Sequence, residues 1–218
     1  MRLGVLGSGT VGTTLAAAFA GAGHDVVLGT GHPDRPETRD WSQASGVPVG
    51  SFAAAADNAS VVVNATAGAA SVAVLTSLAA SLDGTVVLDV ANPLDFSGGF
   101  PPSLTVSNTD SLAEQIQQAL PRAQVVKALN TVTAAVMVAP GSLPEPHHLP
   151  IAGDHPQAKD TVVGLLGDLG WPADSVLDLG GIHAARGMEA YLLLWVRLMG
   201  AMGSAMFNIR IVRAEGSG

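Results

Sequence analysis

Three glycines near the start of the chain, Gly7, Gly9 and Gly12, have the spacing that brings a phosphate close to backbone amides. An apolar run from Leu3 to Leu6 precedes them and an Ala-rich stretch from Thr13 to Ala22 follows, so they lie between a predicted strand and a predicted helix. In that context Gly7 makes the turn, Gly9 lets the backbone approach a pyrophosphate, and Gly12 lets the helix pack on the strand. The free N–H groups of the first helical turn favour an anion. We predict a dinucleotide site; the alternative is a glycine-rich packing turn.

The second predicted strand, Asp25 to Leu28, ends where such a site selects its cofactor. A site for NAD usually places a carboxylate there, about twenty residues past the glycines, to bind the ribose 2′-hydroxyl. This chain has Gly29 and Thr30 at that place, which removes the main repulsion against a 2′-phosphate. Thr30 and His32 could donate hydrogen bonds to a phosphate, and Arg35 could supply charge. We therefore expect NADP rather than NAD; the alternative is that the charges of this loop are simply solvated.

Two further predicted strands, Ser60 to Asn64 and Thr85 to Val90, end in small or polar residues. The first is followed by Ala65 and Thr66, and the second by Asn92 and Pro93. Open α/β folds bind ligands at this edge of the sheet, where small residues let a ribose and a nicotinamide lie against the backbone. The alternative is that the polar end of the first strand caps the helix that follows.

The last long predicted strand of this part, Ala123 to Ala128, places Lys127, Asn130 and Thr131 at the same edge. Lys127 is one of two lysines in the chain. A single cation at the mouth of an apolar cleft could bind an anion or a carbonyl, the alternative being an ordinary surface lysine. Lys127 and Asn130 are the candidates for a catalytic role. Asp89, inside the preceding strand, is expected to brace a loop.

The sequence lacks an obvious acid–base apparatus. The one tyrosine, Tyr191, is not followed by a lysine four residues on, no His-Asp pair lies near the glycines, and no spacing suits a metal. A reaction that needs little proton chemistry is therefore attractive. Direct hydride transfer between two cofactors is such a reaction, because the fold need only align them.

Alternating strand and helix patterns position these residues and predict an α/β fold, a Rossmann-type doubly wound parallel sheet. Near-continuous apolar strands are typical of a sheet that is covered on both faces. A Pro- and Gly-rich segment, residues 139–150, marks a boundary. We expect an NADP-binding domain over 1–140 and a small C-terminal α/β domain over 141–218 for the substrate cleft and dimerisation. The later predicted elements are helices Ala70 to Ser81, Ser111 to Ala119, Thr131 to Val138, His155 to Leu169 and His183 to about Ala205, and strands Leu149 to Ala152, Ser175 to Asp178 and Phe207 to Val212.

Composition excludes several classes of partner. The 218 residues carry a net charge of −8 with only 10 Lys and Arg, which argues against nucleic acid and against an anionic membrane. There is no cysteine, so disulfides and thiol chemistry are excluded. The first strand begins almost at Met1, and the apolar stretch from Tyr191 to Phe207 is too short and interrupted for a membrane span. We expect a cytoplasmic protein.

The ordered motifs GSGTVG, NAT, ANPLD, DSLAEQIQ, VVKALNTV and GDHPQAK resemble those of the NADPH-dependent coenzyme F420 reductases. The pieces LGWP, LDLGGI, ARGMEAYLLLW and FNIRIVR extend the resemblance over essentially the whole chain. It implies a Rossmann domain, a homodimer, and hydride exchange between NADP and a deazaflavin that stacks on the nicotinamide.

Carried over by position, the resemblance implies three groups of contacts. The pyrophosphate would be held by Gly7, Ser8, Gly9, Thr10 and Val11, with Thr30 near the 2′-phosphate. The nicotinamide would be bordered by Ala65, Thr66, Asn92 and Pro93. The deazaflavin side would be lined by Asn130, Thr131, Met137, Trp195 and Met199. Relatives carry a basic residue directly after the position of Thr30, where this chain has Gly31, so His32 or Arg35 would have to substitute.

Two other functions fit the same scaffold. An NADPH-dependent reductase of an imine, a small carbonyl or a ferric chelate would need a proton donor beside the nicotinamide, for which Lys127, Tyr191 and His183 are the candidates. A non-catalytic sensor would bind NADP and turn nothing over.

Overall fold

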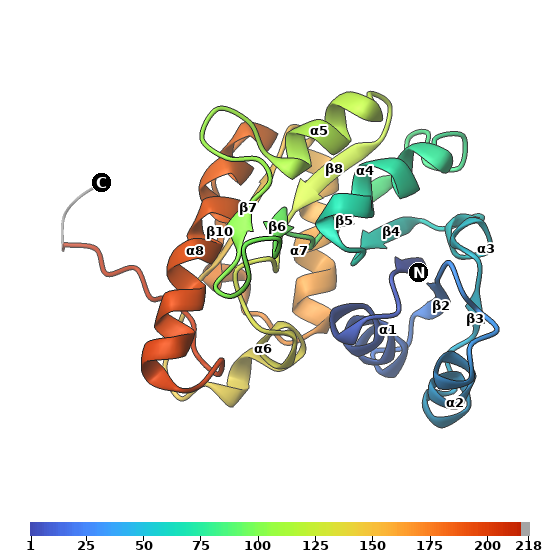
Figure 1. Ribbon diagram of the computed structural model, residues 1–218, viewed down its shortest axis with the longest axis horizontal. Coiled ribbons are helices and arrows are strands. Elements are labelled where there is room, and N and C mark those ends of the chain that lie inside the picture. The colour runs from blue at the N-terminus through green and yellow to red at the C-terminus, as the bar shows by residue number, and fades with distance from the viewer. Residues whose placement is uncertain (215–218) are drawn as a thin grey trace.

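Strands and helices alternate through most of residues 1–214, which the computed structural model describes (Figure 1). The strands are β1 (Arg2–Leu6), β2 (Asp25–Gly29), β3 (Val49–Gly50), β4 (Val61–Asn64), β5 (Val86–Asp89), β6 (Leu94–Asp95), β7 (Ser103–Leu104), β8 (Gln124–Lys127), β9 (Leu149–Gly153) and β10 (Val176–Asp178). The α-helices are α1 (Thr10–Gly21), α2 (Pro36–Ser45), α3 (Phe52–Ala56), α4 (Gly68–Ser77), α5 (Leu112–Ala119), α6 (Ala134–Val138), α7 (Pro156–Asp168) and α8 (Ala185–Met202). Short 3-10 helices are η1 (Pro140–Ser142), η2 (Ala173–Ser175) and η3 (Ile182–Ala184).

The main sheet has the strand order β10-β9-β8-β5-β4-β1-β2-β3, and β6 pairs separately with β7. Neighbouring strands of the main sheet are parallel, except that β9 runs antiparallel to β8. The order reverses between β1 and β4, which is the topological switch point of a doubly wound sheet. The predicted Rossmann-type α/β fold is confirmed.

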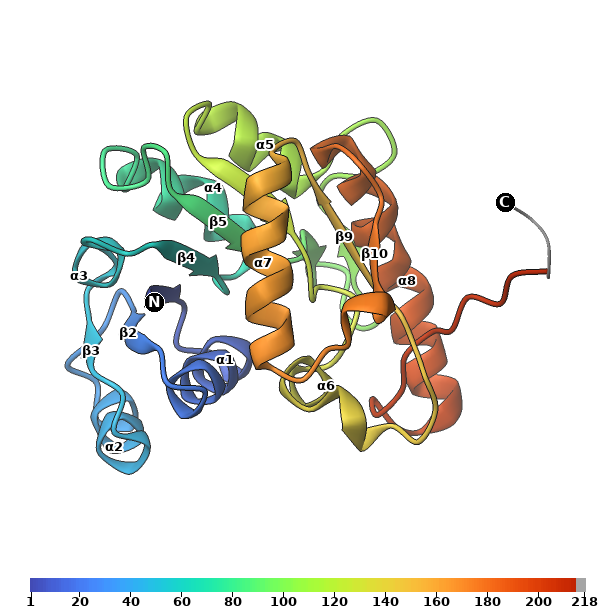
Figure 2. The same ribbon diagram turned by 180° about the vertical axis from the view of Figure 1, so that it is seen from behind.

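The central strands are buried on both faces, as their apolar runs predict. In β4, Val61 and Val63 face one core while Val62 faces the other, and Leu88 and Val87 divide in the same way in β5. Figure 1 shows α4, α5 and α8 over one face, and Figure 2 shows α7 crossing the other, with α1 and α6 beside it. This packing fixes the carboxyl ends of β1, β4, β5 and β8 along one edge.

The C-terminal α/β elements extend the same sheet, because β9 hydrogen-bonds to β8 and β10 to β9. A domain boundary between residues 140 and 141 stays a prediction. Within residues 1–214, no helix has the length and apolar composition needed to cross a bilayer.

Two parts of the sequence prediction are wrong or incomplete. The segment predicted as a charged loop after β2 contains α2, a polar helix whose signals were Pro36 in its first turn and Gly46, with φ +73°, as its C-cap. The predicted strand from Phe207 to Val212 is irregular. Its described backbone is held by single bonds, such as the one from the His148 N–H to the Ile209 carbonyl, rather than by a ladder.

Helix boundaries also shift for local reasons. α1 begins at Thr10, so the last glycine of the turn is already helical. α6 begins at Ala134 because the residues before it form a turn in which Leu129 has a φ of +63°. α8 ends at Met202, because its C-cap Gly203 has a left-handed φ of +65°, which stops the helix short of the predicted Ala205.

Candidate active site

The turn after β1 contains glycines of two kinds. A Cβ on Gly7 would clash with the Ala65 carbonyl, and one on Gly12 would clash with the Gly7 carbonyl. Gly7 also has a φ of +116°. Among the described residues, nothing lies within 4 Å of a Cβ placed on Gly9. The fold itself therefore requires two of the glycines, whereas the third leaves open space at the start of α1.

The N-terminus of α1 is free to receive an anion. Gly9 is the N-cap and supplies no side-chain hydrogen bond, and the first turn carries no acidic residue. The helix dipole and the N–H groups of its first turn favour negative charge at this position. Ser8, Gly9 and Thr10 are exposed, so the backbone amides of this turn are accessible from solvent.

Thr30 follows β2 and lies beside this turn. Its hydroxyl and that of Ser8 are hydrogen-bonded at 3.0 Å, and the His32 backbone N–H donates to Thr30 Oγ1 at 3.3 Å. His32 and Arg35 are exposed, and within residues 1–214 the Arg35 guanidinium has no ion pair. The structure thus brings the three predicted 2′-phosphate residues to one loop, with one cation uncommitted.

A cavity of about 330 Å³ lies between α1 and α2, beside Ser8. Its walls include Thr38 and Trp41 from α2, and also Glu37. Sequence reasoning missed Glu37 because the segment was expected to be a loop. The Glu37 carboxylate, in the first turn of α2, would repel a 2′-phosphate. Its effect on the affinity for NADP would therefore oppose that of Arg35.

The sequence suggested that Lys127 lies at the mouth of a cleft, and this prediction is wrong. Its side chain is fully buried, and its ammonium group is 2.8 Å from both Asp89 Oδ2 and Glu189 Oε1. It also donates to the Ala91 carbonyl. Burial alone would lower the pKa of Lys127, but the two carboxylates outweigh it and raise this pKa above its usual range. Lys127 is therefore a core cation rather than a free base.

Asp89 braces the edge, as expected. Its Oδ1 accepts from Asn64 Nδ2 at 2.8 Å and from the Ala91 N–H at 3.2 Å. Asn64 Oδ1 in turn accepts from the hydroxyl of Thr66 at 2.7 Å. A continuous hydrogen-bond chain therefore links the ends of β4, β5 and β8. The Thr66 hydroxyl already donates inside the protein, which leaves mainly its backbone and methyl group for a ligand.

Glu189 was not identified from the sequence. It is 1% exposed, and its carboxylate accepts from the backbone N–H groups of Leu112 and Ala113 at the start of α5, at 2.8 and 3.1 Å. Burial raises the pKa of Glu189, and Lys127 only partly opposes this. The available signal was a lone carboxylate in the apolar run GMEAYLLLW.

Asn92 and Asn130 meet across the edge. Asn92 Nδ2 donates to the Asn130 carbonyl at 2.9 Å, and Asn130 Nδ2 donates to Asn92 Oδ1 at 2.9 Å. Asn130 Nδ2 also donates to the Met188 carbonyl of α8 at 3.1 Å. The predicted nicotinamide and deazaflavin sides are thus joined by paired amides.

Four buried polar atoms near this edge and in α8 have no hydrogen-bond partner in the described part of the chain. They are Asn130 Oδ1, Thr131 Oγ1, Tyr191 OH and Trp195 Nε1. Burial raises the pKa of Tyr191, so its hydroxyl stays protonated at neutral pH. Unpartnered polar atoms in a protein interior call for an explanation, and a bound ligand is one.

The other three residues predicted to line the deazaflavin, Trp195, Met199 and Met137, lie on different sides of the sheet. Trp195 lies on α8 and stacks on Phe207, with ring centroids 5.4 Å apart, and Met199 is half-buried one turn further along α8. Met137 does not lie where the resemblance implied, on the deazaflavin side. It is 4% exposed in the core beneath α1 and α7, and its carbonyl accepts from Trp171, so its side chain serves packing instead of an open ring surface.

The parallel sheet, its switch point and the glycine turn define a Rossmann-type oxidoreductase fold. A family model described as NADP oxidoreductase, coenzyme F420-dependent, matches residues 2–93. A crystal structure from Arthrobacter sp. FB24, of a protein proposed to be an F420-dependent NADP reductase, is 46% identical over 98% of this chain and 100% of its own, with a TM-score of 0.93. The chain belongs to the F420-dependent NADP oxidoreductase family.

More distant similarities point the same way in fold. A hypothetical protein from Sinorhizobium meliloti is 25% identical, with 85% of this chain and 88% of that protein covered and a TM-score of 0.69. Metalloreductase STEAP3 from Rattus norvegicus is 30% identical over 189 residues, 87% of this chain. The matched part is only 36% of STEAP3, so this chain spans a minor share of that relative's length.

Proposed function

We propose that the protein transfers a hydride between NADP(H) and the deazaflavin coenzyme F420. The observation that carries the proposal is the environment of Lys127, which is fully buried and paired with Asp89 and Glu189. Because this cation belongs to the core, the edge offers hydrogen-bonding groups and small residues instead of a basic proton acceptor. Such a site suits the alignment of two rings.

The residues of the edge fit NADP. The open space at Gly9 and the uncapped start of α1 suit a pyrophosphate. Thr30, His32 and Arg35 lie together for a 2′-phosphate. The pyrophosphate would be held by Gly7, Ser8, Gly9, Thr10 and Val11, and the nicotinamide would be bordered by Ala65, Thr66, Asn92 and Pro93. NADP(H), when bound, supplies the hydride chemistry, while these residues bind and orient it.

The deazaflavin would take the side of the edge that α8 covers. Asn130 and Thr131 supply unpartnered polar atoms there, and Trp195 and Met199 supply apolar surface. These groups hold a planar ring and exclude water without themselves exchanging a proton. Lys127 would act only by holding the loops after β5 and β8.

One observation favours a second function. Tyr191 carries a buried, unpartnered hydroxyl that remains protonated at neutral pH, which is what a reductase of an imine or small carbonyl needs as a proton donor. The similarity to a metalloreductase supports ferric chelates as further acceptors to test. If Tyr191 is this proton donor, Tyr191→Phe abolishes reduction of the imine or carbonyl. Hydride transfer to F420 does not need the Tyr191 hydroxyl.

Mixing the pure protein with NADPH and oxidised F420, and following the deazaflavin absorbance, tests the proposal. We expect the absorbance to fall at a rate proportional to protein concentration. Consumption of NADPH only with imines, carbonyls or ferric chelates would replace F420 as the acceptor. Binding of NADPH with no consumption under any of these conditions would assign a sensor.

The same proposal includes a homodimer. It is supported by apolar side chains that α8 leaves on the surface, Leu193 at 44% and Leu194 at 55% exposed. Light scattering at micromolar concentration should give twice the chain mass. Leu194→Glu should return the mass to that of one chain, whereas a monomeric wild-type protein would exclude the dimer.

A further inference from the structure

Two halves of a hydrogen-bond ring meet at the carboxyl edge of the sheet. In the first half, Lys127 binds the Ala91 carbonyl after β5 and the Glu189 carboxylate near the start of α8. In the second, Asn130 binds Asn92, which follows Ala91 directly, and the carbonyl of Met188, which precedes Glu189. The ring therefore joins the loops after β5 and β8 to α8.

The chemistry of the ring fixes the orientation of the Asn130 amide. Asn92 Nδ2 must be the atom that faces the Asn130 carbonyl, because only the amide nitrogen can donate. Asn92 Oδ1 is then an acceptor, so the Asn130 atom that meets it is Nδ2, as the contact with the Met188 carbonyl also requires. Asn130 Oδ1 is left as an acceptor, in a residue 2% exposed, with no partner within residues 1–214.

Glu189 determines where α8 lies in this ring. Its carboxylate holds Lys127 from β8 and the first N–H groups of α5 at once. Because Met188 is its neighbour in α8, the position of the Met188 carbonyl depends on these bonds. Loss of the Glu189 charge would free the start of α8 and, with it, one of the two bonds that hold the Asn130 amide.

We propose that Glu189 is a positioning residue: it anchors α8 so that Asn130 presents Oδ1 as an acceptor for an amide-type N–H of a ring ligand. The nicotinamide carboxamide and the pyrimidine ring of a deazaflavin both carry such a group. The proposal deepens the proposed function and rests on its assignment of this edge to the reacting rings. A buried acceptor left without an N–H partner is costly, so the site selects ligands that provide one.

A matched control separates positioning from helix packing. Arg186 also ties α8 to α5, through two hydrogen bonds to Glu114 at 2.8 and 2.6 Å. Within residues 1–214 its side chain forms no hydrogen bond or ion pair with the residues of the hydrogen-bond ring. Arg186→Ala should lower stability and leave the Asn130 amide unchanged. Glu189→Gln keeps the shape and removes the charge. Glu189→Asp keeps the negative charge beside Lys127 and should therefore keep the fold. The aspartate side chain is one methylene shorter, so it cannot contact Lys127 and the first N–H groups of α5 at the same time.

The test follows the side-chain ¹⁵N–¹H₂ signals of Asn130, assigned by their disappearance in Asn130→Asp. In the wild type they should shift with NADP⁺ alone if the carboxamide is the donor, or with F420 alone if the pyrimidine is. In Glu189→Gln and Glu189→Asp the amide protons should exchange about 10-fold faster. The affinity for the ligand that shifts them should fall about 10-fold. The affinity for 2′,5′-ADP, which has no nicotinamide and reaches only the glycine turn and the loop with Thr30, His32 and Arg35, should stay unchanged.

Three outcomes would overturn the proposal: signals that neither ligand shifts, Glu189 variants whose amide exchange matches the wild type, or Arg186→Ala behaving like Glu189→Gln. If NADP⁺ shifts the signals in a Glu189-dependent way but F420 is never reduced, the positioning role stands and the proposed acceptor fails. The amide signals thus report on Glu189 independently of turnover.

Discussion

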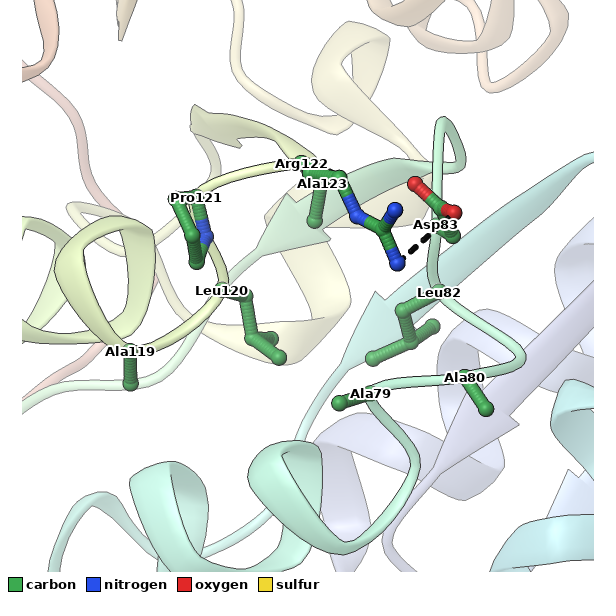
Figure 3. A pocket seen from close by; sticks show the side chains of 9 residues that line it. All are labelled: Ala79, Ala80, Leu82, Asp83, Ala119, Leu120, Pro121, Arg122 and Ala123. Carbon is green, nitrogen blue, oxygen red and sulfur yellow. Dashed lines mark ion pairs between the residues drawn. The ribbon is translucent and has the colours of Figure 1, made fainter.

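Both edges of the sheet carry ion pairs, in opposite surroundings. At the carboxyl edge Lys127, Asp89 and Glu189 are all at most 2% exposed. At the amino edge, before β5 and β8, Arg122 and Asp83 pair at 3.0 Å with side chains 76% and 42% exposed. Figure 3 shows this pair together with the side chains of Leu82, Leu120 and several alanines. These residues line an apolar hollow of about 330 Å³.

Buried and exposed ion pairs differ in how much stability is lost when one of their charges is removed. A buried ion has been taken out of water, so its partners depend on it, whereas an exposed pair exchanges easily with solvent. Unpartnered polar atoms, such as Asn130 Oδ1, accompany the buried charges. The residues that line the amino-edge hollow are mostly small and apolar, and offer no comparable set of hydrogen-bonding groups. The carboxyl edge therefore combines rigidity with available hydrogen-bonding groups, as a ligand site requires.

The largest effect is expected from Lys127→Met. The substitution leaves Asp89 and Glu189 as uncompensated buried carboxylates, which should cost about 3–5 kcal/mol of unfolding free energy. Urea denaturation measures it. The control is Lys159→Met, which removes the other lysine from a partly exposed pair with Asp178 and should cost about 0–1 kcal/mol. Equal losses in the two variants would show that burial does not distinguish the pairs.

Gly9→Val should abolish nucleotide binding without loss of stability. The side chain has room in the protein but would occupy the place of the pyrophosphate. We expect NADPH affinity to fall at least about 100-fold, since close backbone approach is lost. Gly21→Val, at the far end of α1 and equally free of contacts in the described chain, is the control. Unchanged affinity in Gly9→Val would refute the phosphate turn.

Arg35→Ala should lower affinity for NADPH about 10-fold and leave that for NADH unchanged, because one charge-assisted hydrogen bond is lost. Glu37→Gln should act in the opposite direction, since it removes a carboxylate near the same place. Fluorescence titration with both cofactors measures each effect. Parallel changes for NADH and NADPH would place neither residue at the 2′-phosphate.

The smallest effect is expected at the amino edge. Arg122→Ala removes the ion pair of Figure 3 and should change the unfolding free energy by less than about 0.5 kcal/mol, with NADPH affinity unaltered. Thermal melting and the same titration check both statements. A fall in NADPH affinity would mean that the amino edge contributes to the ligand site.

The sequence was most informative where local chemistry and fold agree. The glycine spacing, the apolar strands and the polar strand ends predicted which residues share one edge of the sheet, because the carboxyl ends of parallel strands meet there. That a dinucleotide binds at this edge stays a prediction. The prediction for Lys127 was wrong because the residues around it in the sequence do not indicate that Glu189, 62 residues away, pairs with it. Likewise the family resemblance implied that Met137 lines the deazaflavin side, but α6 packs it into the core between α1 and α7. Long-range pairing of this kind is decided by tertiary structure alone.

The most direct test of the carboxyl edge as a hydride-transfer site uses NADPH deuterated at the reactive nicotinamide carbon. Incubated with oxidised F420 and the protein in ordinary water, it should yield reduced deazaflavin that carries one deuterium, from one of the two NADPH epimers only, and Gly9→Val should yield none. Mass spectrometry measures the label. Reduced F420 without deuterium, or no reduced F420 with NADPH bound, would contradict transfer between two aligned rings.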